Sequence, residues 1–393
     1  MSIRVSQPAV NIREKLTENS SPPIGAHGSE LMNSSSVNES FDLVKAGRKN
    51  MVINGDFQIA QRATSKSGIT ASPNWHYQSV DRWTTGMSGA GTWTASQDSD
   101  VPDGYGFTKS WKLDCTTADA DVDSGDYFIL EHRIEANRMA HLCWGTKRAK
   151  PVTLSFWVKS SVTGDPTVML HGDNFNTTRI INQTYSINQA NTWEYKTMTF
   201  PSSGPENAWT TDHTIGIRLW MWFKAGSTWN AGTGSRNYWR NNAANQQAPG
   251  TTINIASSTS NNLWITGVQL EEGYNATPFE YKTYDEQLKD CQRYFMKRRL
   301  YGNCSTGYSQ GGGGYSSHLM NIPLPCKMRN TPSVGFNNGS ATGAFQPGGN
   351  QASFDALASG IDFVSVKTGS TNSTWTTQVV SSQSPEITLD AEI

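Results

Sequence analysis

The segment Asn50-Met-Val-Ile-Asn-Gly-Asp-Phe57 marks the point at which the character of the sequence changes. Residues 1–48 hold two short stretches with helical spacing, Ile12–Leu16 and Val37–Val44, and a Pro-Pro pair between them ends any helix. Too few apolar residues are present there to build an independent core. The segment either stays mobile or is ordered against another protein. We favour the second, with apolar contacts made by Ile12, Leu16, Phe41 and Val44.

From Asn50 to about Tyr281 the sequence gives repeated strand signals bounded by turn residues. Such runs include Val152–Val158, Trp193–Phe200, Thr214–Phe223 and Asn262–Leu270. Many strands at short spacing, almost without helices, predict a two-sheet sandwich. The composition agrees, because only 17% of residues are charged, against about 25% in an average globular domain. We therefore expect a mainly β fold.

The charge pattern argues against several function classes. The formal net charge is −1, so no overall field attracts nucleic acid or an anionic membrane. No apolar run approaches the roughly 18 residues that would predict insertion into a membrane, and the N-terminus lacks the apolar core of a secretory signal. The five Cys residues are an odd number without a CxxC pair and suggest reduced thiols. We expect synthesis in a cytoplasm.

The stretch Tyr284–Leu300 predicts a helix that connects two domains. Acidic residues lie in its first turn and Lys297, Arg298 and Arg299 in its last, which complements the helix dipole. Its apolar stripe consists of Leu288, Cys291 and Phe295. Short strand signals then predict a small β-domain over residues 301–393, at Ile361–Val366, Trp375–Val380 and Glu386–Ile393.

Several blocks of the sequence resemble bacteriophage tail-fibre and other virion proteins. The opening block is Arg48–Arg62, followed by Val80–Trp83, and the start of the chain, Val10–Leu16, is similar to N-terminal segments of marine phage virion proteins. The remaining blocks are Leu154–Lys159, Ile265–Gly273 with Ala276–Glu280, Glu286–Phe295 and Pro323–Pro332. The order of these blocks along the chain carries the resemblance.

The resemblance implies four parts: a virion-attachment segment (1–48), a jelly-roll sandwich like a carbohydrate-binding module (49–283), a connecting helix (284–300) and a C-terminal β-domain (301–393). It also implies a homotrimer in the phage particle, joined to other virion proteins and presenting its β-domains to a host-surface glycan. We expect a tail-fibre subunit without enzymatic activity. The alternatives are a capsid-decorating or capsid-vertex fibre without a receptor role, and a polysaccharide depolymerase tailspike.

No catalytic motif is present, since the sequence lacks a nucleophile elbow, a zinc-protease helix and a P-loop. Aromatic rings can stack on sugar rings while polar side chains bond to their hydroxyls. The polar stretch Lys224–Gln247 is expected to be a long loop, and its glycan-binding candidates are Trp229, Arg236, Tyr238 and Trp239. Trp220 and Trp222 alternate along a strand, so we expect them to be buried on one face. Packing of this loop against another subunit is the alternative.

The acidic run from Asp119 to Asp126 resembles a calcium-binding loop, because alternate carboxylates followed by a Glu suit Ca²⁺. The candidate ligands are Asp119, Asp121, Asp123 and Glu131. The Gly and Glu of this run each stand one position late for an EF-hand loop. The alternative is a solvated acidic turn. No other cofactor is expected.

Overall fold

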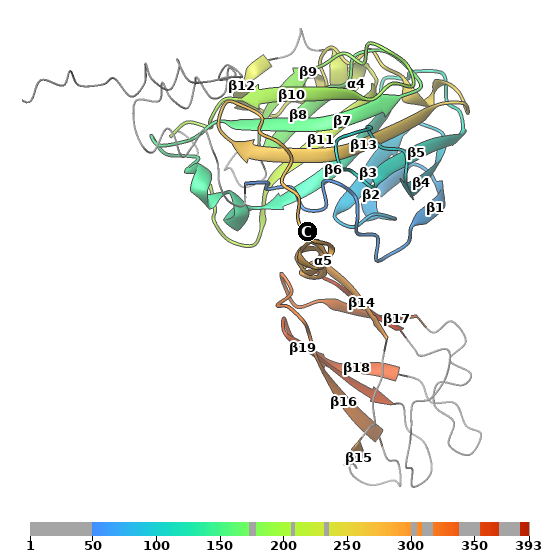
Figure 1. The fold of residues 1–393 in the computed structure, drawn as a ribbon, viewed down its shortest axis with the longest axis vertical. Helices are drawn as coiled ribbons and strands as arrows, with labels where there is room; N and C mark the ends of the chain where they lie inside the picture. Colours follow the sequence, from blue (N-terminus) through green and yellow to red (C-terminus); the bar gives the residue numbers. More distant parts are fainter. Residues whose placement is uncertain are drawn as a thin grey trace, which may run out of the picture. The chain divides into compact units, whose positions relative to one another are not determined.

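The computed structural model describes residues 49–172, 178–205, 209–231, 236–299, 305–308, 317–337, 354–368 and 386–392 (Figure 1). Most of the elements are antiparallel strands, which confirms the mainly β class. Among these residues no helix is long and apolar enough to span a bilayer. The expected attachment residues Ile12, Leu16, Phe41 and Val44 lie outside the described residues.

In the part of the chain that the structure describes, one sheet has six strands. Their order is β1-β4-β5-β13-β7-β10. Every neighbouring pair in it is antiparallel. Its strands are β1 (Ser65–Ile69), β4 (Thr92–Asp98), β5 (Ser110–Thr117), β7 (Val152–Ser160), β10 (Glu194–Phe200) and β13 (Asn262–Glu272).

The second antiparallel sheet has the order β12-β9-β8-β11-β6-β3-β2. Its strands are β2 (Ser72–Tyr77), β3 (Trp83–Ser88), β6 (Tyr127–Glu135), β8 (Thr167–Gly172), β9 (Arg179–Thr184), β11 (Ile215–Ala225) and β12 (Arg236–Asn241). Short helical turns follow some strands: η1 (Ala136–Leu142), α4 (Ser227–Asn230), η2 (Ala244–Gln246) and η3 (Ile255–Ser257). The stretch Lys224–Gln247 is therefore not one long loop, because α4 and the edge strand β12 lie within it.

Eight of these strands form a jelly roll. In the first sheet the order is β5-β13-β7-β10 and in the second it is β9-β8-β11-β6. Along these eight strands the chain changes sheet after every strand except β8, whose hairpin with β9 keeps both strands in one sheet. The edge strand β12, which comes between β11 and β13 in the chain, extends the second sheet beside β9. This is the connectivity of two interlocked Greek keys. The expected jelly-roll sandwich is confirmed.

Alternation of side chains along the strands builds the core between the two sheets. In β7, the residues Val152, Leu154, Phe156 and Val158 are fully buried, whereas Trp157 and Lys159 face outward. The same period of two in β11 turns Leu219 and Met221 toward the core. Three tryptophans are enclosed among these aliphatic side chains: Trp83, Trp93 and Trp111.

The segment that opens the domain is fixed to its last strand. The Asn50 side-chain amide donates to the carbonyl of Val268 (3.1 Å), and its Oδ1 accepts from the main-chain N–H of Leu270 (3.1 Å), both in β13. A Cβ atom at Gly55 would lie 2.1 Å from the Val268 carbonyl oxygen. Only glycine allows this approach, in which the Val268 N–H donates to the Gly55 carbonyl (2.9 Å). The segment thus closes the sandwich.

Two further residues of the segment adopt left-handed backbone conformations, Asn54 with φ of 58° and Phe57 with φ of 56°. The Asn54 side chain stabilises its turn, since it donates to the Ile59 carbonyl and accepts from the Ile59 N–H, both at 2.9 Å. The turn directs Phe57 into the core, where its ring centre lies 5.1 Å from Trp83 and 5.9 Å from Trp111. Sequence alone did not reveal this role.

The connecting helix is shorter than expected. Helix α5 (Tyr284–Gln292) begins with a capping box in which Thr283 and Glu286 bond to each other's backbone N–H. The prediction of helix up to Leu300 was wrong, because Phe295–Arg299 forms β14. Lys297, Arg298 and Arg299 therefore do not cap a helix. Pairing of β14 with β20 (Glu386–Asp390), far along the chain, overrides the local helical preference.

The C-terminal region contains two small antiparallel sheets in the described ranges. One has the order β14-β20-β17, where β17 is Ser333–Asn337, and its strand β20 confirms the strand expected at Glu386. The other has the order β15-β16-β19-β18, with β15 Ser305–Tyr308, β16 Ser317–Pro323, β18 Phe354–Ser359 and β19 Phe363–Thr368. The expected strand Trp375–Val380 lies outside the described residues.

Candidate functional site

The acidic run expected to bind Ca²⁺ converges instead on a lysine. The Lys224 side chain is fully buried, and its ammonium lies 3.1 Å from a carboxylate oxygen of Asp126 and 3.4 Å from one of Asp119. It also donates to the carbonyls of Gly89 (2.5 Å) and Asp119 (3.2 Å). A covalently attached cation thus lies among the oxygens that a metal would need.

The four candidate calcium ligands are not brought together. Glu131 belongs to β6 and is fully buried, where it forms ion pairs with Arg133 (2.8 Å) and Arg218 (3.3 Å). Asp121 and Asp123 are exposed. In the part of the chain that the structure describes, no group of three His, Cys, Asp or Glu residues could hold a metal ion. The residues present do not fit the expected calcium site.

The loop aromatics expected to bind a glycan do not share one surface. Trp239 lies in β12 and is only 9% exposed, with its indole N–H donating to the Pro201 carbonyl (2.9 Å). The expectation that Trp239 is exposed was wrong, because strand alternation turns it toward the core while the neighbouring Tyr238 stays 51% exposed. Arg236 begins β12 opposite Asn182. Trp229 lies in α4 against the ring of Tyr127 (5.5 Å).

Trp220 and Trp222 face outward from the seven-stranded sheet and not into the core between the sheets. Trp222 is buried in a second cluster, as expected. Trp220 is half-buried, and its ring stacks between Trp75 (5.2 Å) and His171 (5.1 Å). A Cβ at Gly86 would lie 2.1 Å from the Trp75 ring, so glycine makes room for it on the sheet. Packing of these rings against one another accounts for their positions on the outer face of the sheet.

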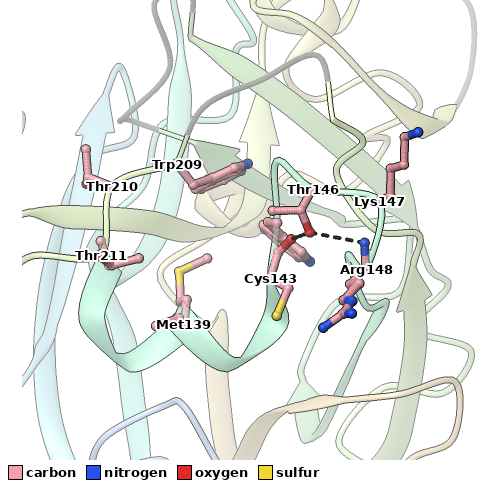
Figure 2. A pocket seen from close by; sticks show the side chains of 11 residues that line it. Met139, Cys143, Thr146, Lys147, Arg148, Trp209, Thr210 and Thr211 are labelled. Carbon is pink, nitrogen blue, oxygen red and sulfur yellow. Dashed lines mark hydrogen bonds between the residues drawn. The ribbon is translucent and has the colours of Figure 1, made fainter.

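A cavity of about 540 Å³ opens where η1 and the turn after it face the loop before β11 (Figure 2). Figure 2 shows Thr210 and Thr211 on one side and Thr146, Lys147 and Arg148 on the other. The lining residues are Ala136, Met139, Ala140, Cys143, Trp144, Thr146, Lys147, Arg148, Trp209, Thr210 and Thr211. A volume of this size suits a small ligand.

Three indole rings support the cavity. Trp144 meets Trp209 edge-to-face at 4.9 Å and Trp239 at 5.2 Å, and Trp209 lies 6.0 Å from Trp239. The Trp144 N–H donates to the Lys150 carbonyl (2.6 Å), which fixes the ring. Trp239, a glycan-binding candidate from the sequence, does not line the cavity. It packs against Trp144 and Trp209, the two indoles that do.

The turn that carries the cationic side chains is held by its own hydrogen bonds. Cys143 ends η1 in a left-handed conformation (φ 52°). The Thr146 hydroxyl donates to the Cys143 carbonyl (2.7 Å) and accepts from the Arg148 N–H (3.1 Å). Lys147 and Arg148 lie exposed at the rim, whereas Met139 is buried. The cavity combines an apolar interior with a hydroxyl-bearing, cationic rim.

The opposite rim is fixed to η1 through Asp212. The Thr214 N–H (2.9 Å) and the Thr210 hydroxyl (3.3 Å) donate to its carboxylate. Hydrogen bonds from Thr214 lower the pKa of Asp212. The Asp212 carbonyl accepts from the Asn137 N–H (2.8 Å) at the start of η1. Sequence reasoning missed this site because its two walls are about 65 residues apart, and Trp209 in a polar loop was its only local signal.

No protein-family model matches the chain, and no curated protein matches it. Among solved structures it is similar to the enzymatically active domain of tailspike protein 4 of bacteriophage CBA120, with 13% identity over 57% of this chain and 21% of that chain, TM-score 0.28. The chain thus matches about a fifth of the length of that protein.

Several smaller solved structures are matched over nearly their whole length, and two of them serve as examples. One is a putative sugar binding protein from Bacteroides thetaiotaomicron, with 12% identity over 57% of this chain and 100% of that chain, TM-score 0.29. The other is a family 11 carbohydrate-binding module from Clostridium thermocellum in complex with a β-1,3-1,4-mixed-linked tetrasaccharide, with 9% identity over 56% of this chain and 99% of that chain, TM-score 0.26.

Proposed function

We propose that this chain is a glycan-binding protein and that the cavity beside η1 receives one sugar unit with a negative charge. The observation that carries the proposal is the combination of an indole wall with a rim of hydroxyls and cations in a cavity of about 540 Å³. The half-buried ring of Trp209 offers apolar surface to the C–H face of a sugar. Thr210 and Thr211 offer hydroxyls to its polar edge.

The charge of the rim supports an acidic sugar. Lys147 and Arg148 are exposed, and the eleven described residues that line the cavity include no carboxylate. Asp212, close to the rim, already accepts hydrogen bonds from Thr210 and Thr214. A uronate or another carboxylate-bearing sugar would pair with the two cations. The same lining supports binding without hydrolysis, since glycosidases generally use two carboxylates that flank the bond they cleave.

The wider role that we propose is that of a tail-fibre subunit in a phage particle. Residues 1–48 would attach it to other virion proteins, and the jelly roll would present the cavity to a glycan of the host surface. The subunit would be a homotrimer. Support comes from the order of the sequence blocks that resemble virion proteins. A fibre on the capsid and a depolymerase tailspike are the competing roles.

Two variants test the cavity: one removes the two positive charges at its rim, and the other removes the indole ring of Trp209. Trigalacturonate is titrated calorimetrically into the wild-type chain, into Lys147→Gln/Arg148→Gln and into Trp209→Ala, with the corresponding neutral trigalactose as a second ligand. We expect each variant to lose about tenfold or more in affinity for the uronate. The control is Lys66→Gln/Lys289→Gln, which removes two exposed cations elsewhere.

Wild-type binding should weaken as the salt concentration rises to about 1 M, because the cations are exposed. Failure of the wild-type chain to bind trigalacturonate, or equal affinity in the cavity variants and the control, would contradict the proposed site. Release of reducing ends from a host polysaccharide by the purified chain would favour the depolymerase role. A cryo-EM map of the particle would distinguish a tail position from a capsid position.

A further inference from the structure

The outer face of the six-stranded sheet carries aromatic side chains where a sandwich exposed only to water would carry polar ones. Tyr105 is 56% exposed and Tyr195 is 45% exposed, and both lie beside the half-buried Trp157 of β7. Their ring centres form a row, with 4.3 Å from Tyr105 to Trp157 and 5.2 Å from Trp157 to Tyr195. None of the three contributes to the core between the sheets.

The loop before β5 is shaped to place Tyr105 on this row. The residues on either side, Gly104 (φ +79°) and Gly106 (φ +78°), both adopt the left-handed conformation that favours glycine. The Tyr281 hydroxyl donates to the Tyr105 carbonyl and so fixes the loop. The loop therefore holds the Tyr105 ring at the surface, because packing into the core does not account for its position.

The rest of the face is balanced in charge. Lys112 and Lys159 lie over the ring of Trp264, at 5.3 Å and 4.6 Å. Lys159 is paired with Asp100, and the Trp193 N–H donates to the same carboxylate (3.0 Å). Burial raises the pKa of Asp100, but the hydrogen bonds from Lys159 and Trp193 outweigh it and hold that pKa below its usual value. Asp114 lies two residues after Lys112 in β5.

The composition of the face indicates what it would bind. Strand alternation places rings, hydroxyls, amides, Lys159 and the buried carboxylate of Glu271 outward on β7, β10 and β13. Among these described outward positions, for example Ser155, Trp157, Tyr195, Thr197 and Trp264, no aliphatic residue is found. The centre of a protein–protein interface is enriched in Met and Arg as well as in aromatic rings, and neither Met nor Arg stands at these outward positions. Rings between hydroxyls suit sugar rings, and the balanced charge suits a neutral chain.

We propose that the Tyr105–Trp157–Tyr195 row is a second glycan-binding surface, which takes a neutral polysaccharide along the outer face of the six-stranded sheet. The row shares no residue with the cavity beside η1, and the proposal does not depend on that cavity. The rings would stack on the apolar faces of successive sugars. The exposed hydroxyl of Thr197 next to Tyr195 would bond to their edges.

The test is affinity gel electrophoresis in gels cast with mixed-linkage β-glucan, xyloglucan or galactomannan. The variant Tyr105→Ala/Tyr195→Ala removes two exposed rings and should leave the fold intact. The matched control, Tyr238→Ala/Tyr284→Ala, removes two rings that are 51% and 55% exposed elsewhere. We expect at least one polymer to retard the wild-type chain and the control equally, and the row variant to lose about tenfold in affinity.

Retardation by a neutral polymer should not change as the salt concentration rises, nor in Lys147→Gln/Arg148→Gln. If the wild-type chain does not bind trigalacturonate but is still retarded by a neutral polymer, only the cavity proposal is overturned. If none of the three polymers retards the wild-type chain, or if the row variant is retarded as strongly as the control, the second surface is overturned.

Discussion

The carboxylate of Glu392 contacts the guanidinium of Arg82, a side chain that lies 310 positions earlier and is fully buried. The same guanidinium lies 3.5 Å from the ring centre of Tyr294 and donates to the Arg133 carbonyl (2.6 Å). Burial lowers the pKa of Arg82, but the charge of Glu392 outweighs it and raises that pKa. A residue of the C-terminal region therefore neutralises a cation enclosed at the sandwich.

Replacement of Glu392 by Gln should destabilise the protein by about 3 kcal/mol, because it leaves the buried guanidinium without its carboxylate. Calorimetric melting measures the effect. The control is Glu272→Gln, which removes the partner of Lys150 (2.7 Å) in a pair whose lysine is 44% exposed, and should cost at most about 1 kcal/mol. Equal costs for the two variants would show that burial of Arg82 does not strengthen its ion pair.

Chelation of divalent cations should leave the melting temperature of the sandwich unchanged. The Lys224 ammonium already occupies the position between Asp119 and Asp126. Melting is compared in EDTA and in Ca²⁺. A rise in melting temperature with Ca²⁺ would contradict this expectation and restore the calcium hypothesis. The variant Lys224→Met should lower the melting temperature in both buffers, since two carboxylates lose their cation.

The contribution of Asp81 to the free energy of unfolding should fall as the pH rises from about 4 to about 7. Burial raises the pKa of Asp81 from 3.8 to about 6 in the folded protein. The folded state therefore holds a proton that the unfolded state releases, and this stability is present below pH 4 and lost as the pH rises through 6. The free energy of unfolding of Asp81→Asn minus that of the wild type should therefore increase by roughly 3 kcal/mol as the pH rises from 4 to 7.

Urea unfolding of both proteins across that range measures the difference. The hydrogen bond that Asp81 accepts from the Gln61 N–H (2.9 Å) contributes an offset to the variant at every pH. Only the slope of the difference with pH reports the titration. A difference that stays constant from pH 4 to pH 7 would place the pKa of Asp81 near its ordinary value.

The intact chain should form a homotrimer, as the sequence resemblance implies. Multi-angle light scattering should then give a mass three times the 43.2 kDa of one chain. Light scattering of a chain that starts at Lys49 tests whether residues 1–48 are needed for assembly. A monomer mass for the intact chain would contradict the trimer.

The fold was predictable where one face of each strand is buried. The alternation Val152, Leu154, Phe156, Val158 is readable in the sequence, and the structure places all four in the core. The error at Phe295–Arg299 has the opposite cause. The spacing of its apolar residues and its terminal charges suit a helix, but the main-chain partner of this segment is β20, which local preferences cannot reveal.

The candidate site was predictable only in its residue types. The lining of the proposed site has the aromatic and polar loop side chains that the sequence singled out elsewhere, but alternation along β12 sends Trp239 to the core side. Trp144 and Trp209 meet because η1 and the loop before β11 are joined by hydrogen bonds such as that from the Asn137 N–H to the Asp212 carbonyl. That juxtaposition depends on the jelly-roll connectivity and has no local signature.

The bonds from Asn50 to Val268 and Leu270 join residues more than 200 positions apart. A fold closed by contacts of such long sequence separation has a high contact order and folds slowly. On the ribosome, β5, β7 and their neighbours emerge well before β13, which lies between β5 and β7 in the finished sheet. Until about residue 272 has been synthesised, the nascent chain therefore has two strand edges without a partner. This incomplete sheet is the state most prone to aggregation.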